Sequence, residues 1–119
     1  MKILVASVLA LTLGGCSMIP SFWDDNESRL AVEVRYRVHL LDCTADYKEQ
    51  SKDIVDAIQL LEFYSESKGS NDLQEMIQPM QATADGLHNM TNNETFCKLQ
   101  KKQLETQSAS VADAVMWRY

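Results

Sequence analysis

The sequence is poor in the two residues that most often interrupt regular structure, with four glycines and two prolines in 119 residues. Neither residue occurs between Asp24 and Ser67. The chain therefore lacks glycine-rich loops that could cradle phosphate groups. It also contains none of the short motifs of nucleotide-binding loops, serine nucleophile elbows or zinc proteases. This scarcity favours long helices over a loop-built enzyme, and we expect neither enzymatic activity nor a cofactor.

Basic residues are also scarce. The chain has 11 Lys and Arg against 17 Asp and Glu, which gives a formal net charge of −6 at pH 7. The basic residues form no extended patch. Nucleic acids and anionic lipid surfaces are polyanions that repel an acidic domain, so we expect no nucleic-acid partner.

Residues suited to acid–base or metal chemistry are few. The two histidines, His39 and His88, stand apart in the sequence and are most simply surface residues. His39 lies near Asp42, Cys43 and Asp46, but this spacing matches no known ligand pattern. The sequence therefore predicts no catalytic residues and no metal site.

The chain opens with a segment typical of exported proteins. Lys2 supplies one positive charge, and residues 3–13 form an uncharged, mostly apolar run. This run is shorter than the roughly 17–25 residues of a membrane-spanning helix, which is typical of a cleavable signal peptide. The residues Leu13-Gly14-Gly15-Cys16 resemble the lipobox of bacterial lipoproteins, in which small residues precede an obligatory cysteine.

This resemblance implies that residues 1–15 are removed and that Cys16 carries diacylglycerol and an acyl chain such as palmitate. Ser17, and not Asp, follows the cysteine. In Gram-negative bacteria this implies an outer-membrane lipoprotein whose domain faces the periplasm. An ordinary secretory signal with a chance cysteine and an uncleaved anchor are the alternatives.

Two cysteines, Cys43 and Cys97, remain once Cys16 carries lipid. An even number of cysteines in an oxidising compartment favours a disulfide, and no Cys-x-x-Cys spacing points to reactive or metal-binding thiols. We therefore predict a Cys43–Cys97 disulfide. Because it closes a long loop, the chain-entropy treatment gives it a contribution of roughly 4 kcal/mol.

The mature chain divides into a lipidated tether, residues 16–23, and a domain, residues 24–119. The tether's Ile19, Phe22 and Trp23 are expected either at the membrane interface or against the domain. In the domain, the capping motif Asp24-Asp25-Asn26-Glu27 marks a helix start, and Lys68 followed by Gly69 marks a helix end. Together they predict one long first helix.

A second helix is predicted from Ser70 or Asn71 to about Asn89, with a kink or a first-turn break at Pro79. The capping box Thr91-Asn92-Asn93-Glu94 predicts the start of a third. The sequence therefore predicts an all-α fold, a small bundle or hairpin of about three helices that one disulfide pins.

Residues 24–42 would then form an overhang, a part of the first helix that the other two helices do not reach. This overhang would either project as a stalk or fold back at Cys43-Thr44. The alternating segment 32–40 also fits a strand, but no second alternating run exists to pair with it, which favours helix. The apolar face of the overhang would need cover from a protein partner or a second copy. The partner-binding residues predicted on this basis, together with the aromatic chain end, are Val34, Tyr36, Val38, Trp117 and Tyr119.

These patterns favour a non-enzymatic envelope accessory that works by protein–protein contact. One alternative is a small-molecule or lipid-binding module with a groove lined by Ile58, Leu61, Met76 and Met80. Another is a bacteriophage-encoded lipoprotein that interferes with a receptor or assists lysis, which would be similar in size and plan.

Overall fold

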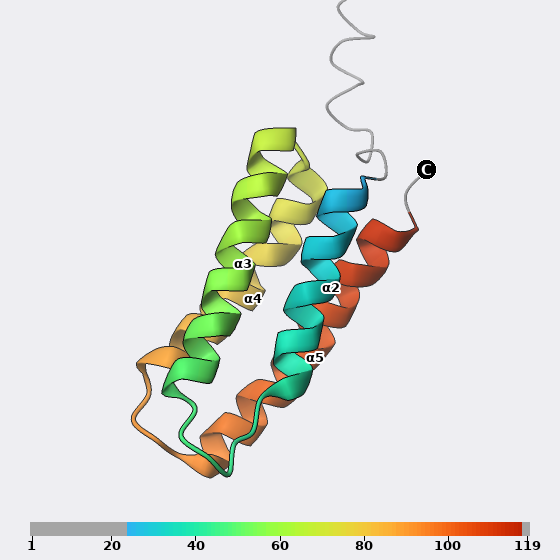
Figure 1. Ribbon diagram of the computed structural model, residues 1–119. Helices are drawn as coiled ribbons and strands as arrows, with labels where there is room; N and C mark the ends of the chain where they lie inside the picture. The colour runs from blue at the N-terminus through green and yellow to red at the C-terminus, as the bar shows by residue number, and fades with distance from the viewer. Residues whose placement is uncertain (1–23, 118–119) are drawn as a thin grey trace, which may run out of the picture.

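A computed structural model of the protein describes residues 24–117, and all regular structure in that range is helical (Figure 1). The helices are α2 (Asp25–Leu40), α3 (Lys48–Lys68), α4 (Asn71–Asn89) and α5 (Glu94–Met116). The expectation of an all-α domain is confirmed. The predicted signal peptide (1–15), the lipidation site Cys16, the rest of the tether and Tyr119 lie outside the described residues.

The helices form an antiparallel four-helix bundle in which the chain runs alternately in the two directions (Figure 1). Helix α2 packs on α3 and α5, and α4 packs on the same two helices, so each helix has two neighbours. We call the end that holds the start of α2, the α3–α4 turn and the end of α5 the near end. The far end holds the α2–α3 and α4–α5 turns. The chain therefore enters and leaves the described domain at the near end.

The helices form because apolar side chains recur every three or four residues and meet in one core. In α2 this stripe is Leu30, Val34 and Val38, all buried. The stripes of the other helices complete the core with Ile54, Ile58, Leu61, Leu73, Ile77, Met80, Leu87, Leu104, Val111 and Val115.

The prediction of a single helix over residues 24–68 is wrong. Helix α2 ends at Leu40, α3 begins at Lys48, and the described chain has four helices in place of three. The intervening turn folds α2 back along α3 and α5, so its apolar face is buried inside the bundle and forms no stalk. The folding-back alternative is the one found. The segment 32–40 lies within α2, which confirms helix over strand.

The turn between α2 and α3 is built from polar side chains rather than glycine or proline. Asp42 Oδ1 accepts hydrogen bonds from the Thr44 backbone N–H (3.0 Å) and hydroxyl (2.6 Å). The Gln50 amide reaches back from α3, accepting from Asp42 N (2.7 Å) and donating to the Asp42 and Asp46 carbonyls. Asp46 Oδ1 accepts from Lys48 N (2.9 Å) at the start of α3. Short polar side chains thus offer the backbone an alternative to continued helix.

The other predicted boundaries hold with small shifts. Gly69 ends α3 with a φ of 83°, the left-handed conformation that glycine adopts without a Cβ penalty. Helix α4 starts at Asn71, one of the two predicted starting positions, and Pro79 lies inside it without ending it. In α5 the capping residue is Asn93, whose Oδ1 accepts from Phe96 N at 3.0 Å.

The far end is held by a disulfide and a buried tyrosine. Cys43 and Cys97 are bonded, with their Cα atoms 5.6 Å apart, which confirms the predicted pairing. Nearby, the phenol of buried Tyr47 donates to Thr91 O (3.0 Å) and accepts from Asn93 N (2.9 Å). Together these contacts fix the two far-end turns against each other.

We expect the double variant Cys43→Ala/Cys97→Ala to remain helical but to lose about 2–4 kcal/mol of unfolding free energy, because the unfolded chain regains the entropy of a loop spanning 54 positions. Urea unfolding followed by circular dichroism measures this difference. Native protein under reducing conditions is the control and should approach the variant. Equal midpoints for the variant and the oxidised protein would contradict the prediction.

Candidate functional site

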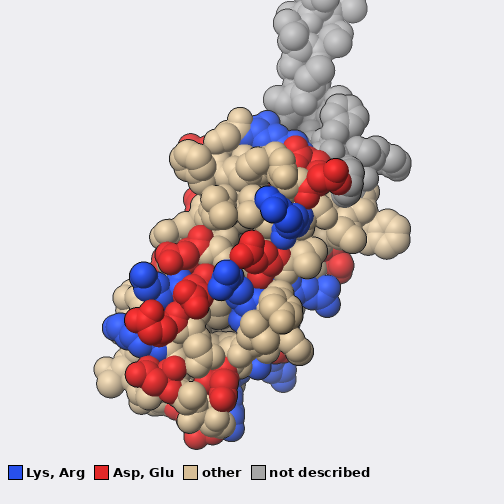
Figure 2. Space-filling model, in the orientation of Figure 1, with Lys and Arg blue, Asp and Glu red and all other residues tan. Residues whose placement is uncertain are grey.

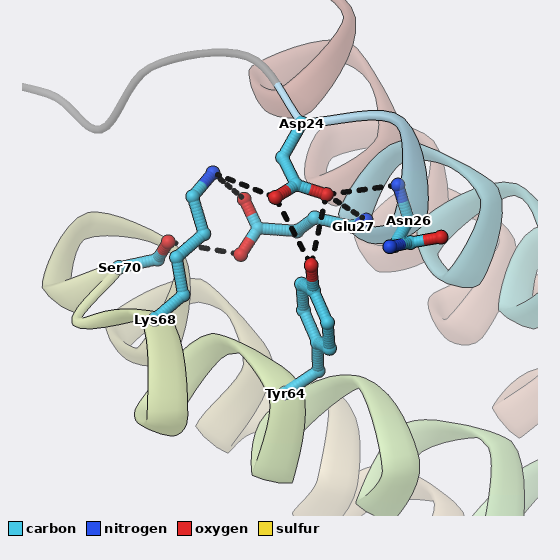
Figure 3. A network of polar contacts seen from close by, with 6 residues as sticks. All are labelled: Asp24, Asn26, Glu27, Tyr64, Lys68 and Ser70. Carbon is cyan, nitrogen blue, oxygen red and sulfur yellow. Dashed lines mark hydrogen bonds and ion pairs between the residues drawn. The ribbon is translucent and has the colours of Figure 1, made fainter.

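A compact polar cluster holds the start of α2 at the near end (Figure 3). Asp24 caps the helix, its Oδ1 accepting from Asn26 N at 2.8 Å and Glu27 N at 3.1 Å. The Tyr64 phenol of α3 lies 3.0 Å from each carboxylate oxygen of Asp24. The point at which the chain enters the domain is therefore bonded both to its own helix and to α3.

Glu27 is the fully buried member of this cluster, with an exposed fraction of 0%. Its carboxylate accepts from the buried Ser70 hydroxyl at 2.9 Å and pairs with Lys68 Nζ at 3.4 Å. Lys68 also lies 4.0 Å from Asp24 Oδ2. Sequence reasoning placed Glu27 in the capping motif of its own helix, whereas the structure uses it to join α2 to the α3–α4 turn. A buried carboxylate needs such partners because unpaired burial of a charge is costly.

The electrostatics of Asp24 follow from this geometry. The hydrogen bond from the Glu27 backbone holds the pKa of Asp24 below its ordinary value of 3.8, against the opposing effect of burial. The Tyr64 phenol, the Asn26 backbone N–H and the Lys68 charge act in the same direction. The charged carboxylate is thus the form that the folded near end favours.

The outer face of α2 carries the largest helical run of exposed apolar side chains. Val32, Tyr36 and Leu40 recur every four residues and are 47%, 59% and 55% exposed. Arg35 and His39 are exposed between them. We call Val32, Tyr36 and Leu40 the α2 stripe. It lies opposite the buried stripe of Leu30, Val34 and Val38, so α2 is apolar on two faces and only one is covered within the bundle.

A shallow hollow adjoins this stripe where α2 meets the end of α5. It is lined by Val32, Arg35, Ala112, Asp113, Met116 and Trp117. The Ser28 hydroxyl lies 3.2 Å from Met116 Sδ, which places the end of α5 beside the first turn of α2. Trp117 is 84% exposed.

The five predicted partner-binding residues are not brought together. Val34 and Val38 are buried, with exposed fractions of 1% and 0%, because α2 folds back and uses them as core. Val34 and Val38 are therefore not at the surface of the folded domain, and the expectation that they contact a partner is corrected. Tyr36 and Trp117 are exposed, and Tyr119 lies outside the described residues. The sequence analysis did not single out Val32 and Leu40. Their four-residue spacing from Tyr36 indicates that all three lie on one face of a helix.

The groove expected for a ligand-binding module is not open. Ile58, Leu61 and Met80 are fully buried in the core, and Met76 packs partly buried against it. These four side chains therefore fill the bundle interior and do not line a surface groove.

A serine and a histidine do meet, but not as a hydrolytic pair. Ser51 Oγ lies 3.0 Å from His88 Nδ1 and also donates to Lys48 O at 2.9 Å. Ser51 is 0% exposed, so a substrate carbonyl has no path to its oxygen. The contact instead joins α3 to α4. Within residues 24–117, no group of three His, Cys, Asp or Glu side chains is arranged to hold a metal ion.

The visible charged surface is mixed. Acidic and basic side chains are interspersed over the face in Figure 2, without a broad patch of one sign. Ion pairs contribute to this pattern, among them Arg37 with Glu33 at 3.1 Å and Lys98 with Glu94 at 3.0 Å. Among the helices of residues 24–117, none is long and apolar enough to cross a membrane.

Comparison with protein-family models, curated proteins and solved structures found no match to this chain.

We expect Asp24→Asn to lower the unfolding free energy at pH 7, because asparagine keeps the capping oxygen but loses the charge that Lys68 and the backbone N–H groups favour. The folded pKa of Asp24 lies below the unfolded one. Its contribution is therefore present above the ordinary value of 3.8 and is lost as the pH falls through the folded pKa. Urea unfolding at a series of pH values should show the native–variant difference shrinking on acidification. A difference that stays constant with pH would contradict this account.

Proposed function

We propose that the protein is an outer-membrane lipoprotein, anchored through Cys16, whose periplasm-facing bundle works as a non-enzymatic accessory by contacting another envelope protein. The anchor is supported by the signal-like segment and the Leu13-Gly14-Gly15-Cys16 sequence. The contact role is carried by one observation, the exposed α2 stripe. It supplies an apolar and aromatic surface that the bundle does not bury.

The spacing of the stripe suits a helical or flat protein surface. Side chains four residues apart lie about 6 Å from one another along the helix axis, so Val32 to Leu40 spans about 12 Å. Tyrosine and arginine are enriched among the residues that dominate binding energy at protein interfaces. Tyr36 and Arg35 sit together at the middle of the stripe, flanked by Val32 and Leu40.

This surface favours a contact protein over a ligand carrier. The residues expected to line a ligand groove fill the core, whereas the exposed apolar area lies on the outside of α2. A convex helix face excludes water only when a partner with a matching surface covers it.

The lipid anchor is tested directly by intact mass measurement of the protein purified from membranes of a Gram-negative host. We expect a chain that begins at Cys16 and carries the added mass of diacylglycerol and one acyl chain. Cys16→Ala should abolish that addition and remove the protein from the membrane fraction. An unmodified native chain, or membrane retention of Cys16→Ala, would refute the anchor.

The contact role is tested by a photo-crosslinking residue placed at Tyr36 in the lipidated protein, with Leu99 as the matched control site. Leu99 is 62% exposed on α5 and is not part of the stripe. We expect one envelope protein to be captured from position 36 and not from position 99. Loss of an interface anchor costs about 1–2 kcal/mol, so Tyr36→Ser should weaken binding to that protein about 5- to 30-fold. Equal capture from both positions would overturn the assignment of the stripe.

A further inference from the structure

We propose that Phe22 and Trp23, the last two residues of the tether, occupy the hollow between α2 and the end of α5. We call this depression the α2–α5 hollow. The tether is then a binding segment for the domain as well as its link to Cys16. This inference goes beyond the proposed contact role, and it holds whether or not Cys16 carries lipid.

The α2–α5 hollow offers an apolar surface that the bundle leaves uncovered. Four of the six described residues that line it are apolar, namely Val32, Ala112, Met116 and Trp117. Three of these side chains are large, and Val32, Met116 and Trp117 remain 47%, 55% and 84% exposed. Large apolar side chains that gather in one depression mark a surface that another apolar group covers.

The hollow lies close to the point at which the chain enters the domain (Figure 1). Ser28, one helical turn after Asp24, lies 3.2 Å from Met116 through its hydroxyl and the sulfur atom. Val32 stands one further turn along α2. At a rise of 1.5 Å per residue, these two positions on α2 are about 6 and 12 Å from Asp24 along the helix axis.

Phe22 and Trp23 are within reach of that surface. They precede Asp24 by two positions and one position, and two extended residues span at most about 7 Å. Asp24 is itself fixed by its capping bonds to the α2 backbone and by the Tyr64 phenol. A chain that turns back at Asp24 therefore brings both aromatic rings to the hollow, at an effective concentration that a separate partner must exceed to compete.

The groups at the hollow suit aromatic rings. Met116 offers a polarisable sulfur, and Arg35 offers a cation for a ring face. Asp113 supplies an acceptor for the indole N–H of Trp23, which a buried indole needs. The tether contains no charged side chain, so covering the hollow with it buries no unpaired charge.

This docking bears on the α2 stripe because Val32 belongs to both surfaces. A partner that covers the stripe at Val32 borders on the docked aromatic rings or displaces them. The contact of the tether and the contact of the partner are therefore linked through one residue.

The first test places a photo-crosslinking residue at Val32 in the full chain, which is isolated and added to phosphatidylcholine vesicles. Leu40 is the matched control site, because it is 55% exposed in the same stripe but lies about 24 Å from Asp24 along the helix axis. We expect tandem mass spectrometry to map the crosslink from position 32 to residues 22–23 of the same chain. Position 40 should give no crosslink to these residues.

Other products of the same experiment identify other occupants. A crosslink from position 32 to lipid would place the hollow at the bilayer, and one to residues 118–119 would assign it to the chain end. A crosslink to a second copy would assign it to a dimer. Each of these results would overturn the proposal, and so would the absence of any crosslink from a variant that circular dichroism shows to be folded.

Fluorescence of Trp117 tests the same docking without a change in the hollow itself. The protein has two tryptophans, so Trp23→Phe and Phe22→Ser/Trp23→Ser each leave Trp117 as the single indole. The first variant keeps two aromatic rings next to Asp24, and the second removes both.

We expect Trp117 in the second variant to emit at longer wavelength and to be quenched more strongly by acrylamide, because its ring loses its cover. Equal emission and equal quenching in the two variants would overturn the docking. Neither measurement needs an envelope partner or a lipidated cysteine, so this failure would leave the proposed function standing.

Discussion

The four-helix bundle depends on the turn at residues 41–47, which reverses the direction of the chain after α2. Without that reversal, Leu30, Val34 and Val38 would form an exposed apolar stripe, and α3 and α5 would each lose one of their two neighbours. Burial of these side chains, at about 1.5–3 kcal/mol for each large one, explains why the reversed form is preferred to a continuous helix. The polar bonds of Asp42, Thr44 and Gln50 compensate the backbone groups that the break leaves without helical partners.

Local signals predicted most helix boundaries because those boundaries are made locally. Asp24 and Gly69 act through their own neighbours in the chain, and both are where the sequence placed them. The sequence leaves the fold-back at Cys43-Thr44 only as an alternative to a continuous helix, because Asp42, Thr44 and Asp46 are weak helix breakers on their own. Their effect depends on burial of α2 and on the Gln50 amide, and both are tertiary. Asp42 and Asp46, on either side of Cys43 and Thr44, are the turn-forming residues that mark this reversal in the sequence.

The features of the candidate site also fall into those that local sequence predicts and those that depend on tertiary packing. The Cys43–Cys97 pairing followed from counting cysteines, since only two remain after Cys16. The exposure of Tyr36 and the burial of Val34 could not be separated, because which face of α2 meets the bundle depends on where α2 folds back. The cluster that joins Glu27 to Ser70 spans 43 positions of sequence and has no local pattern at all. The sequence therefore predicts the disulfide and the helix caps. It does not predict which face of α2 is exposed to solvent.

The disulfide has a further consequence for the connectivity of the bundle. Three of the four neighbouring helix pairs are joined by turns of the chain, and the fourth pair, α2 with α5, is the one whose ends Cys43 and Cys97 link. The bond thus closes residues 43–97, which include α3 and α4, into a covalent ring, and α2 and the rest of α5 are both attached to that ring at the disulfide. Each helix is covalently linked to both of its neighbours, through a turn of the chain or through the disulfide. No helix can therefore separate from the bundle as a rigid body without displacing them. A pull applied to the tether at Asp24 is consequently shared between α3, through the turn, and α5, through the sulfur atoms.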